Sequence, residues 1–64
     1  MRLTDQQIRD TVAHLTASEA ARGINHSKAQ LRGRAKLAEL AIAGNPGARF
    51  VIHAHFNRMQ TGRV

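Results

Sequence analysis

Basic side chains dominate the middle of this chain and are the residues best suited to bind a ligand. Residues 20–38 contain no acidic residue, and the basic or potentially basic residues among them are Arg22, His26, Lys28, Arg32, Arg34 and Lys36. Phosphate binding needs several positive donors on one surface, because neutralising phosphates releases counterions and supplies most of the non-specific affinity for a nucleic acid. Lys28, Arg32 and Lys36 are four residues apart and share one face of a helix. We expect these three and Arg34 to contact phosphates; the alternative is a solvated face or a surface for an acidic protein.

A second group of polar side chains lies nearer the C-terminus. The last two expected helices and the short A-G-N-P-G connection between them resemble a helix-turn-helix, whose last helix would enter the major groove of DNA. Arg49, His53 and Asn57 would then face the bases, since Arg and Asn form bidentate contacts with guanine and adenine. Arg58 would reach a phosphate. We expect Arg49, His53 and Arg58 as secondary nucleic-acid contacts, although Phe50 would lie close to the groove.

Neither the histidines nor the carboxylates have the spacing of a catalytic or metal site. His53 and His55 would share a face only in a β-strand, and in a helix they point in different directions. We expect His55 to be partly buried and to complete an apolar face. The carboxylates are those of Asp5, Asp10, Glu19 and Glu39. No two of them have the spacing of a general acid and a general base that act as a pair. We expect no enzymatic activity, no metal and no cofactor.

The composition restricts the size of the core and the class of partner. The chain has 64 residues, no Cys, no Trp, no Tyr and two Phe, so we expect one domain with a marginal core and no disulfide. Ten Lys and Arg against four Asp and Glu give a net charge of +6, which attracts polyanions or an acidic protein. No stretch approaches the roughly 20 apolar residues that span a bilayer. We expect a cytoplasmic protein that does not associate with membranes.

The segment 35–43, A-K-L-A-E-L-A-I-A, is apolar around most of a helix circumference and predicts the central helix. One apolar seam contains Leu31, Ala35, Ala38 and Ile42, and the second contains Leu37, Leu40 and Ala41. A helix that is apolar on two sides must be covered on two sides, either by the rest of this chain or by a second copy. We expect a homodimer whose protein interface uses Leu37, Leu40, Ala41 and Phe50.

The first helix is expected at 4–22. Thr4 and Gln7 have the spacing of a capping box. The apolar stripe of this helix consists of Ile8, Val12 and Leu15. Glu19 falls on the same stripe; a solvated glutamate is the favoured interpretation, and the alternative is a pair with one of Lys28, Arg32 and Arg34.

The central helix is expected at 27–43, with Asn25 or Ser27 as its N-cap. Gly33 interrupts it at a cost of about 1 kcal/mol relative to Ala. A glycine there either permits the close approach of a neighbour or marks a weak point. Gly44 is expected to end this helix.

A third helix is expected at 46–60, and residues 48–60 of this segment also fit a strand. Asn45 and Pro46 are a good helix start, which favours a helix. As a strand, its apolar residues would alternate equally well. In a helix, Phe50 points away from the main apolar stripe, toward the central helix or a partner. Residues 61–64 are expected to form a frayed tail.

These observations predict an all-α protein, a small three-helix bundle with the second helix in the centre, which forms a dimer. Its expected function is that of a small DNA- or RNA-binding accessory or regulatory protein. The alternative is a non-enzymatic protein-binding module, an inhibitor or adaptor, that uses its apolar seam and basic face against an acidic or apolar surface of another protein.

Overall fold

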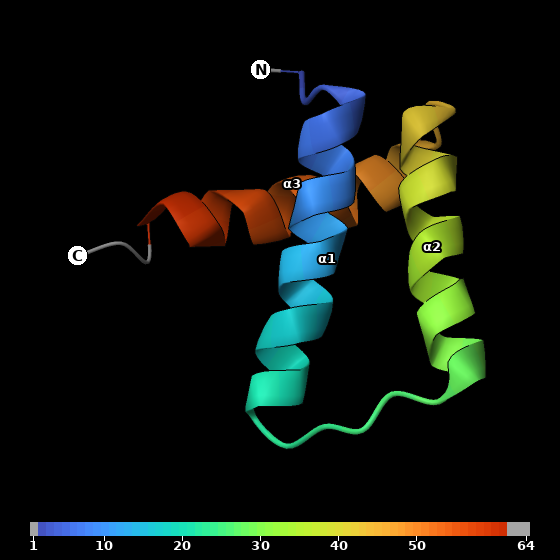
Figure 1. The fold of residues 1–64 in the computed structure, drawn as a ribbon. Helices are drawn as coiled ribbons and strands as arrows, with labels where there is room; N and C mark the ends of the chain where they lie inside the picture. The colour runs from blue at the N-terminus through green and yellow to red at the C-terminus, as the bar shows by residue number, and fades with distance from the viewer. Residues whose placement is uncertain (1, 62–64) are drawn as a thin grey trace.

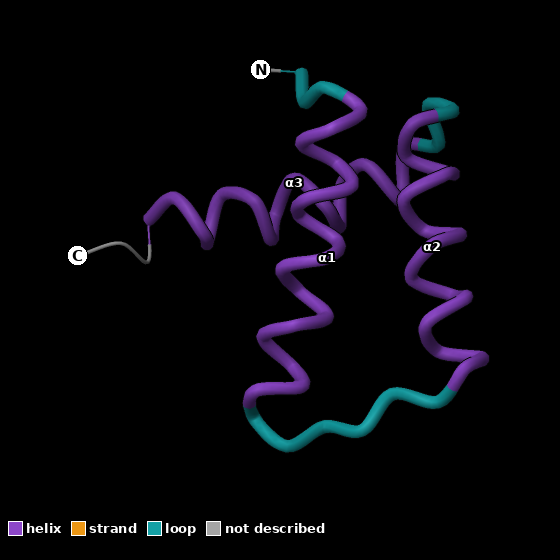
Figure 2. Tube along the Cα trace, viewed as in Figure 1, coloured by secondary structure: helices purple, strands orange, loops and turns teal. Residues whose placement is uncertain are grey.

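Three helices make up the fold. The computed structural model describes residues 2–61 and contains α1 (Asp5–Ala21), α2 (Lys28–Ile42) and α3 (Pro46–Thr61). The first two run antiparallel, and α3 crosses both of them (Figure 1). No residue of the described range lies in a strand (Figure 2). The all-α prediction is confirmed, and the third segment is a helix. The frayed tail is expected to begin at Thr61, but Thr61 belongs to α3, and the rest of that tail, 62–64, lies outside the described residues.

Side-chain caps start α1 and α2. The hydroxyl of Thr4 accepts a hydrogen bond from the Gln7 amide at 3.1 Å, and the Gln7 side chain accepts one from the Thr4 amide at 2.8 Å. Ser27 and Gln30 form the same capping box at the start of α2, with distances of 3.2 and 2.8 Å. These reciprocal bonds satisfy amides that a helix N-terminus otherwise leaves without partners. The predicted capping box at Thr4 is confirmed, and Ser27 is the N-cap of α2.

Glycines terminate α1 and α2. Gly23 has a φ of 90° and Gly44 a φ of 101°, a left-handed conformation that glycine adopts without steric cost. Asn45 then caps α3 by accepting a hydrogen bond from the Ala48 amide at 3.0 Å. Apart from the adjacent residues and the backbone of α2 itself, no atom lies within 4 Å of the position that a Cβ of Gly33 would occupy. No close neighbour therefore requires a glycine at Gly33.

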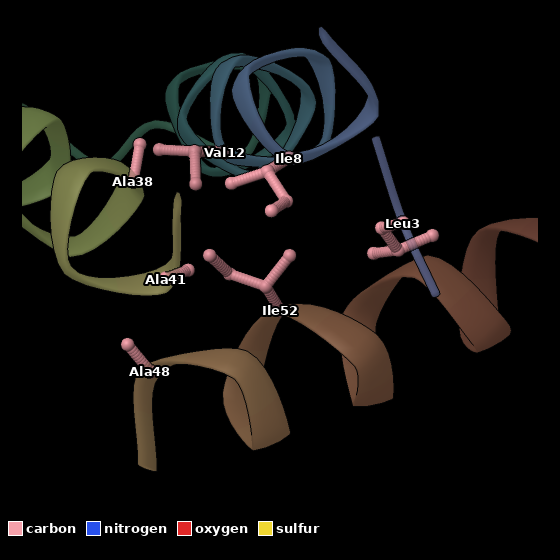
Figure 3. Packing of buried hydrophobic residues seen from close by; sticks show 7 residues of the cluster. All are labelled: Leu3, Ile8, Val12, Ala38, Ala41, Ala48 and Ile52. Carbon is pink, nitrogen blue, oxygen red and sulfur yellow. The ribbon is translucent and has the colours of Figure 1, made fainter. Parts of the chain in front are cut away.

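The core is small and lies where the three helices meet (Figure 3). Its buried apolar residues are Leu3, Ile8, Val12, Ala38, Ala41, Ala48 and Ile52, and the partly buried Leu37, Ile42 and Phe56 pack against them. Three of the seven buried residues are alanines, each of which contributes little apolar area. A core of this size gives a small margin of stability, as expected from the length of the chain.

α2 packs against both other helices. Ala38 and Ala41 are 5% and 0% exposed and face them. Leu31 and Leu40, by contrast, are 46% and 38% exposed. The two apolar seams that the sequence predicts for this helix are therefore covered only in part by residues 2–61.

One face of α3 is buried and the opposite face carries Phe50. The buried stripe is centred on Ile52, with Ala48 and the partly buried Phe56 one turn to either side. Phe50 is 75% exposed, because two residues along a helix it lies nearly opposite Ile52. Val51, one residue before Ile52, lies about 100° around the helix from it and is 47% exposed.

Candidate functional site

Three basic side chains form a strip along the outer face of α2. Lys28, Arg32 and Lys36, which we call the basic strip, are all exposed and follow one another on successive turns. The axial rise from one to the next is about 6 Å, since each residue adds about 1.5 Å. The strip lies on the side of α2 opposite the buried Ala38 and Ala41. Its charged groups are therefore presented to solvent.

The ion pairs found within residues 2–61 both involve Glu19, and none includes a residue of the basic strip. Glu39 is exposed and lies almost one turn beyond Lys36. Its carboxylate reduces the positive potential at the C-terminal end of the strip. The strip is therefore most positive around Lys28 and Arg32.

Arg34, the fourth predicted phosphate contact, is bound to a carboxylate of α1. Its Nη2 donates hydrogen bonds to Glu19 Oε1 at 2.7 Å and Oε2 at 3.0 Å, and His26 Nε2 lies 3.1 Å from Oε1. The side chains of Arg34, Glu19 and His26 are 29%, 18% and 7% exposed. The hydrogen bond to His26 is the main cause that lowers the pKa of Glu19; burial opposes it, and the charge of Arg34 adds to it.

The favoured expectation of a solvated Glu19 is wrong, and the alternative pairing with Arg34 is correct. His26 is a second partner, which the sequence pattern did not indicate. Together they tie the end of α1 to the connecting loop and to α2, and the Ile24 amide adds a hydrogen bond to the Glu19 carbonyl at 3.1 Å. This cluster fixes how α2 is held against α1, and so positions the basic strip.

The predicted secondary contacts lie on α3. Arg49 is half-buried, and its Nη1 donates a hydrogen bond at 3.2 Å to the carbonyl oxygen of Ala41, near the end of α2 where carbonyls lack helical partners. His53 is half-buried and Arg58 is exposed. Phe50 occupies the outer face of the first turns of α3. A docking mode that inserts this face into a DNA groove would therefore present an aromatic ring to the bases.

Two histidines meet where α1 crosses α3. His14 Nδ1 lies 3.4 Å from His55 Nε2, and the ring centroids are 5.6 Å apart at an interplanar angle of 43°. Burial is the main cause that lowers the pKa of His55, followed by the charges of His14 and Arg58. His55 is half-buried, as expected. The contact with His14 joins residues 41 positions apart, and nothing in the local sequence indicates it.

An apolar groove of about 710 Å³ runs between α1 and α2, and none of its lining residues belongs to α3. We call it the α1–α2 groove. Its α1 wall consists of Arg9, Val12, Ala13, Thr16, Ala17 and Ala20, and its α2 wall of Leu31, Arg34, Ala35, Ala38 and Glu39. Ile24 closes one end and is 45% exposed. Alanines that recur at helical spacing in the first helix are the sequence signal for this surface.

The residues predicted for a protein interface have different environments. Ala41 is completely buried and inaccessible to a partner, and Leu37 is half-buried against the core. Leu40 and Phe50 are exposed. Only these last two present an open apolar surface.

No family model, curated protein or solved structure matches this chain. Over residues 2–61, none of the helices has the length and hydropathy of a membrane-spanning segment. Within that range, no group of three or more His, Asp or Glu side chains could hold a metal ion.

Proposed function

We propose that this chain is a small, non-enzymatic nucleic-acid-binding protein, an accessory or regulatory factor whose basic strip contacts phosphates. The observation that carries the proposal is the exposure of Lys28, Arg32 and Lys36 on successive turns of one helix, without an ion pair to any carboxylate of residues 2–61. Each of these groups that meets a phosphate releases condensed counterions, so binding gains free energy without base recognition.

The charge distribution supports the same proposal. The chain carries a net charge of +6, and one of its few carboxylates, Glu19, is held by Arg34 and His26. A positive field of this kind speeds the encounter with a polyanion. In this proposal Arg34 is a positioning residue that holds α2 in place, and the phosphate contacts come from the basic strip.

Recognition of this kind is independent of base sequence. Arg49 is engaged at the end of α2 and Phe50 covers the outer face of α3, so base reading by α3 has little support. The strip contacts phosphates alone, and both DNA and RNA offer them. His53 and Arg58 remain secondary contacts.

A protein-binding function is favoured by a different observation, the α1–α2 groove. Ile24 and Leu31 border it and are 45% and 46% exposed, and contiguous exposed apolar surface marks interaction sites. The chain would then act as an inhibitor or adaptor, and its net charge would favour an acidic partner. In that case substitution of Leu31 would weaken binding more than substitution of Arg32.

Fluorescence anisotropy of labelled duplex DNA and single-stranded RNA tests the proposal. The double reversal R32E/K36E is expected to abolish binding. The matched control, R2E/R22E, changes the net charge equally but leaves the basic strip intact, and is expected to retain most of the affinity. Circular dichroism checks that both variants keep their helices. Equal weakening by the two variants, or no binding by the wild type at low salt, would contradict a role for the strip.

A further inference from the structure

We propose that a second copy of this chain covers the α1–α2 groove, with the two copies related by a twofold axis parallel to α1 and α2. Ile24 and Leu31 border the groove and stay nearly half exposed in the single chain. A chain of 64 residues buries a small fraction of its surface and gains stability from added apolar burial. The inference does not depend on nucleic-acid binding, because no residue of the basic strip lines the groove.

Arg9 and Glu39 lie at the same end of the groove, on opposite walls. The helices α1 and α2 are antiparallel (Figure 1), and Val12 and Ala38 lie beside each other between them (Figure 3). Arg9 precedes Val12 by almost one turn and Glu39 directly follows Ala38, so both lie toward the N-terminal end of α1. Both side chains are exposed and line the groove. The two walls therefore carry opposite charges at nearly the same position along the helix axes.

This charge pattern is self-complementary for one symmetry. A twofold axis parallel to the helices places α1 of one copy over α2 of the other. This rotation does not change the position of any residue along the helix axes. Arg9 then faces Glu39 of the partner subunit, and Glu39 faces Arg9 of the partner subunit, as an isologous interface requires. A twofold axis perpendicular to the helices would instead place α1 over α1 and α2 over α2, so Arg9 would face the Ala20 end of one wall and Glu39 the Leu31 end of the other. The charges therefore select the parallel axis.

The apolar part of the groove fits the same arrangement. Leu31 lies seven residues before Ala38, and Ala20 lies eight residues after Val12, so antiparallel packing puts Leu31 and Ala20 at similar heights. In the dimer, Leu31 packs over the partner's Ala20. Small residues on this wall let the helices approach closely. Four helices, two from each copy, then enclose a shared apolar layer, with each α3 on the outside.

An acidic partner protein is the weaker occupant of the groove. Its carboxylates would pair with Arg9 but would also meet Glu39, and a like-charge contact at an interface is unfavourable. A second copy satisfies both charges at once. Arg9 and Glu39 therefore favour self-association.

Sedimentation equilibrium of the wild type and of the R9E and E39R variants tests this arrangement. The wild type is expected to dimerise. Each single variant is expected to raise the dimer dissociation constant by about tenfold or more, since two opposite-charge contacts become like-charge contacts. An equimolar mixture of R9E and E39R is expected to recover dimerisation, because both contacts between the chains are again opposite in sign. Within each chain the two positions still carry like charges, so the recovery cannot come from a pair inside one chain.

The uncharged variant Leu31→Asn is expected to weaken the dimer as well, because it removes apolar contact area, while Phe50→Ser on the outer face of α3 is expected to leave it unchanged. Circular dichroism checks that each variant stays helical, as expected at exposed positions. A wild type that is monomeric at every accessible concentration would overturn the proposal. So would single variants that dimerise like the wild type, a mixture that stays monomeric, or a dimer lost only in Phe50→Ser.

Discussion

Glu19 and Arg34 join α1 to α2 through hydrogen bonds of 2.7 and 3.0 Å, both donated by one guanidinium nitrogen to the two carboxylate oxygens. His26, from the connecting loop, lies 3.1 Å from the same carboxylate. One acidic side chain on the apolar stripe of α1 therefore holds the loop and the next helix. The orientation of α2, and with it that of the basic strip, depends on this carboxylate.

Glu19→Gln is expected to lower the melting temperature. A neutral amide accepts a weaker hydrogen bond than a carboxylate, and the substitution leaves the partly buried charge of Arg34 without its counter-charge. Asp10→Asn is the matched control, because the Asp10 carboxylate is exposed and its hydrogen-bond partner, Gln6, lies on the same helix. Thermal unfolding followed by circular dichroism measures both. An equal decrease of the melting temperature in the two variants would contradict a special role for Glu19.

The same carboxylate makes stability depend on pH. The hydrogen bond to His26 is the main cause that lowers the pKa of Glu19 in the folded chain below its ordinary value of 4.5. Stability from Glu19 is therefore fully present above about pH 4.5 and is lost as the pH falls through the lower folded-state pKa. The difference in melting temperature between wild type and Glu19→Gln is expected to shrink over that range. A difference independent of pH would contradict this linkage.

His55 is expected to titrate below an ordinary histidine. Burial is the largest cause that lowers the pKa of His55, and the charges of His14 and Arg58 lower this pKa further. The charge of Glu19 acts in the opposite direction and raises it. His14→Gln removes one of these charges and is expected to raise the pKa of His55. NMR titration of the imidazole protons measures the change, with His53→Gln as the control on the same helix. An unchanged pKa of His55 in His14→Gln would contradict the 3.4 Å contact.

Ile52 and Phe50 are two residues apart on α3 and have opposite environments, at 2% and 75% exposed. Ile52→Ala is expected to lower the free energy of unfolding by about 2–5 kcal/mol, because it leaves a cavity in the core. Phe50→Ala at an exposed position is expected to change it by less than about 0.5 kcal/mol. Urea denaturation measures both. In a strand the two side chains would share a face. Similar decreases in the free energy of unfolding for the two variants would therefore contradict the helix.

Helix starts could be predicted from the sequence because their chemistry is local. The hydroxyl of Thr4 and the amide of Gln7 are three residues apart, and no tertiary contact is needed to bring them together. The apolar stripe of α1 is equally local. The sequence indicated both Asn25 and Ser27 as candidate N-caps of α2. Only the path of the loop decides which of them caps the helix.

The partners of Glu19 could not be predicted in the same way. Several basic residues of α2 were within reach in sequence, and the distance and rotation between α1 and α2 select Arg34. His14 and His55 meet only because α3 crosses α1. The open side of Leu31 likewise depends on which face of α2 the third helix covers. These are properties of helix packing, which a single sequence pattern does not determine.

The salt dependence of duplex DNA binding tests the claim that the basic strip binds phosphates. The three phosphate contacts of the strip contribute about −2.7 to the slope of log K against log salt, which is three times about −0.9. Lys36→Gln removes one contact and is expected to reduce the magnitude of that slope by about 0.9, whereas Arg2→Gln, with the same change in net charge, is expected to leave it unchanged. Slopes that change equally in the two variants, or no binding at low salt, would contradict the claim.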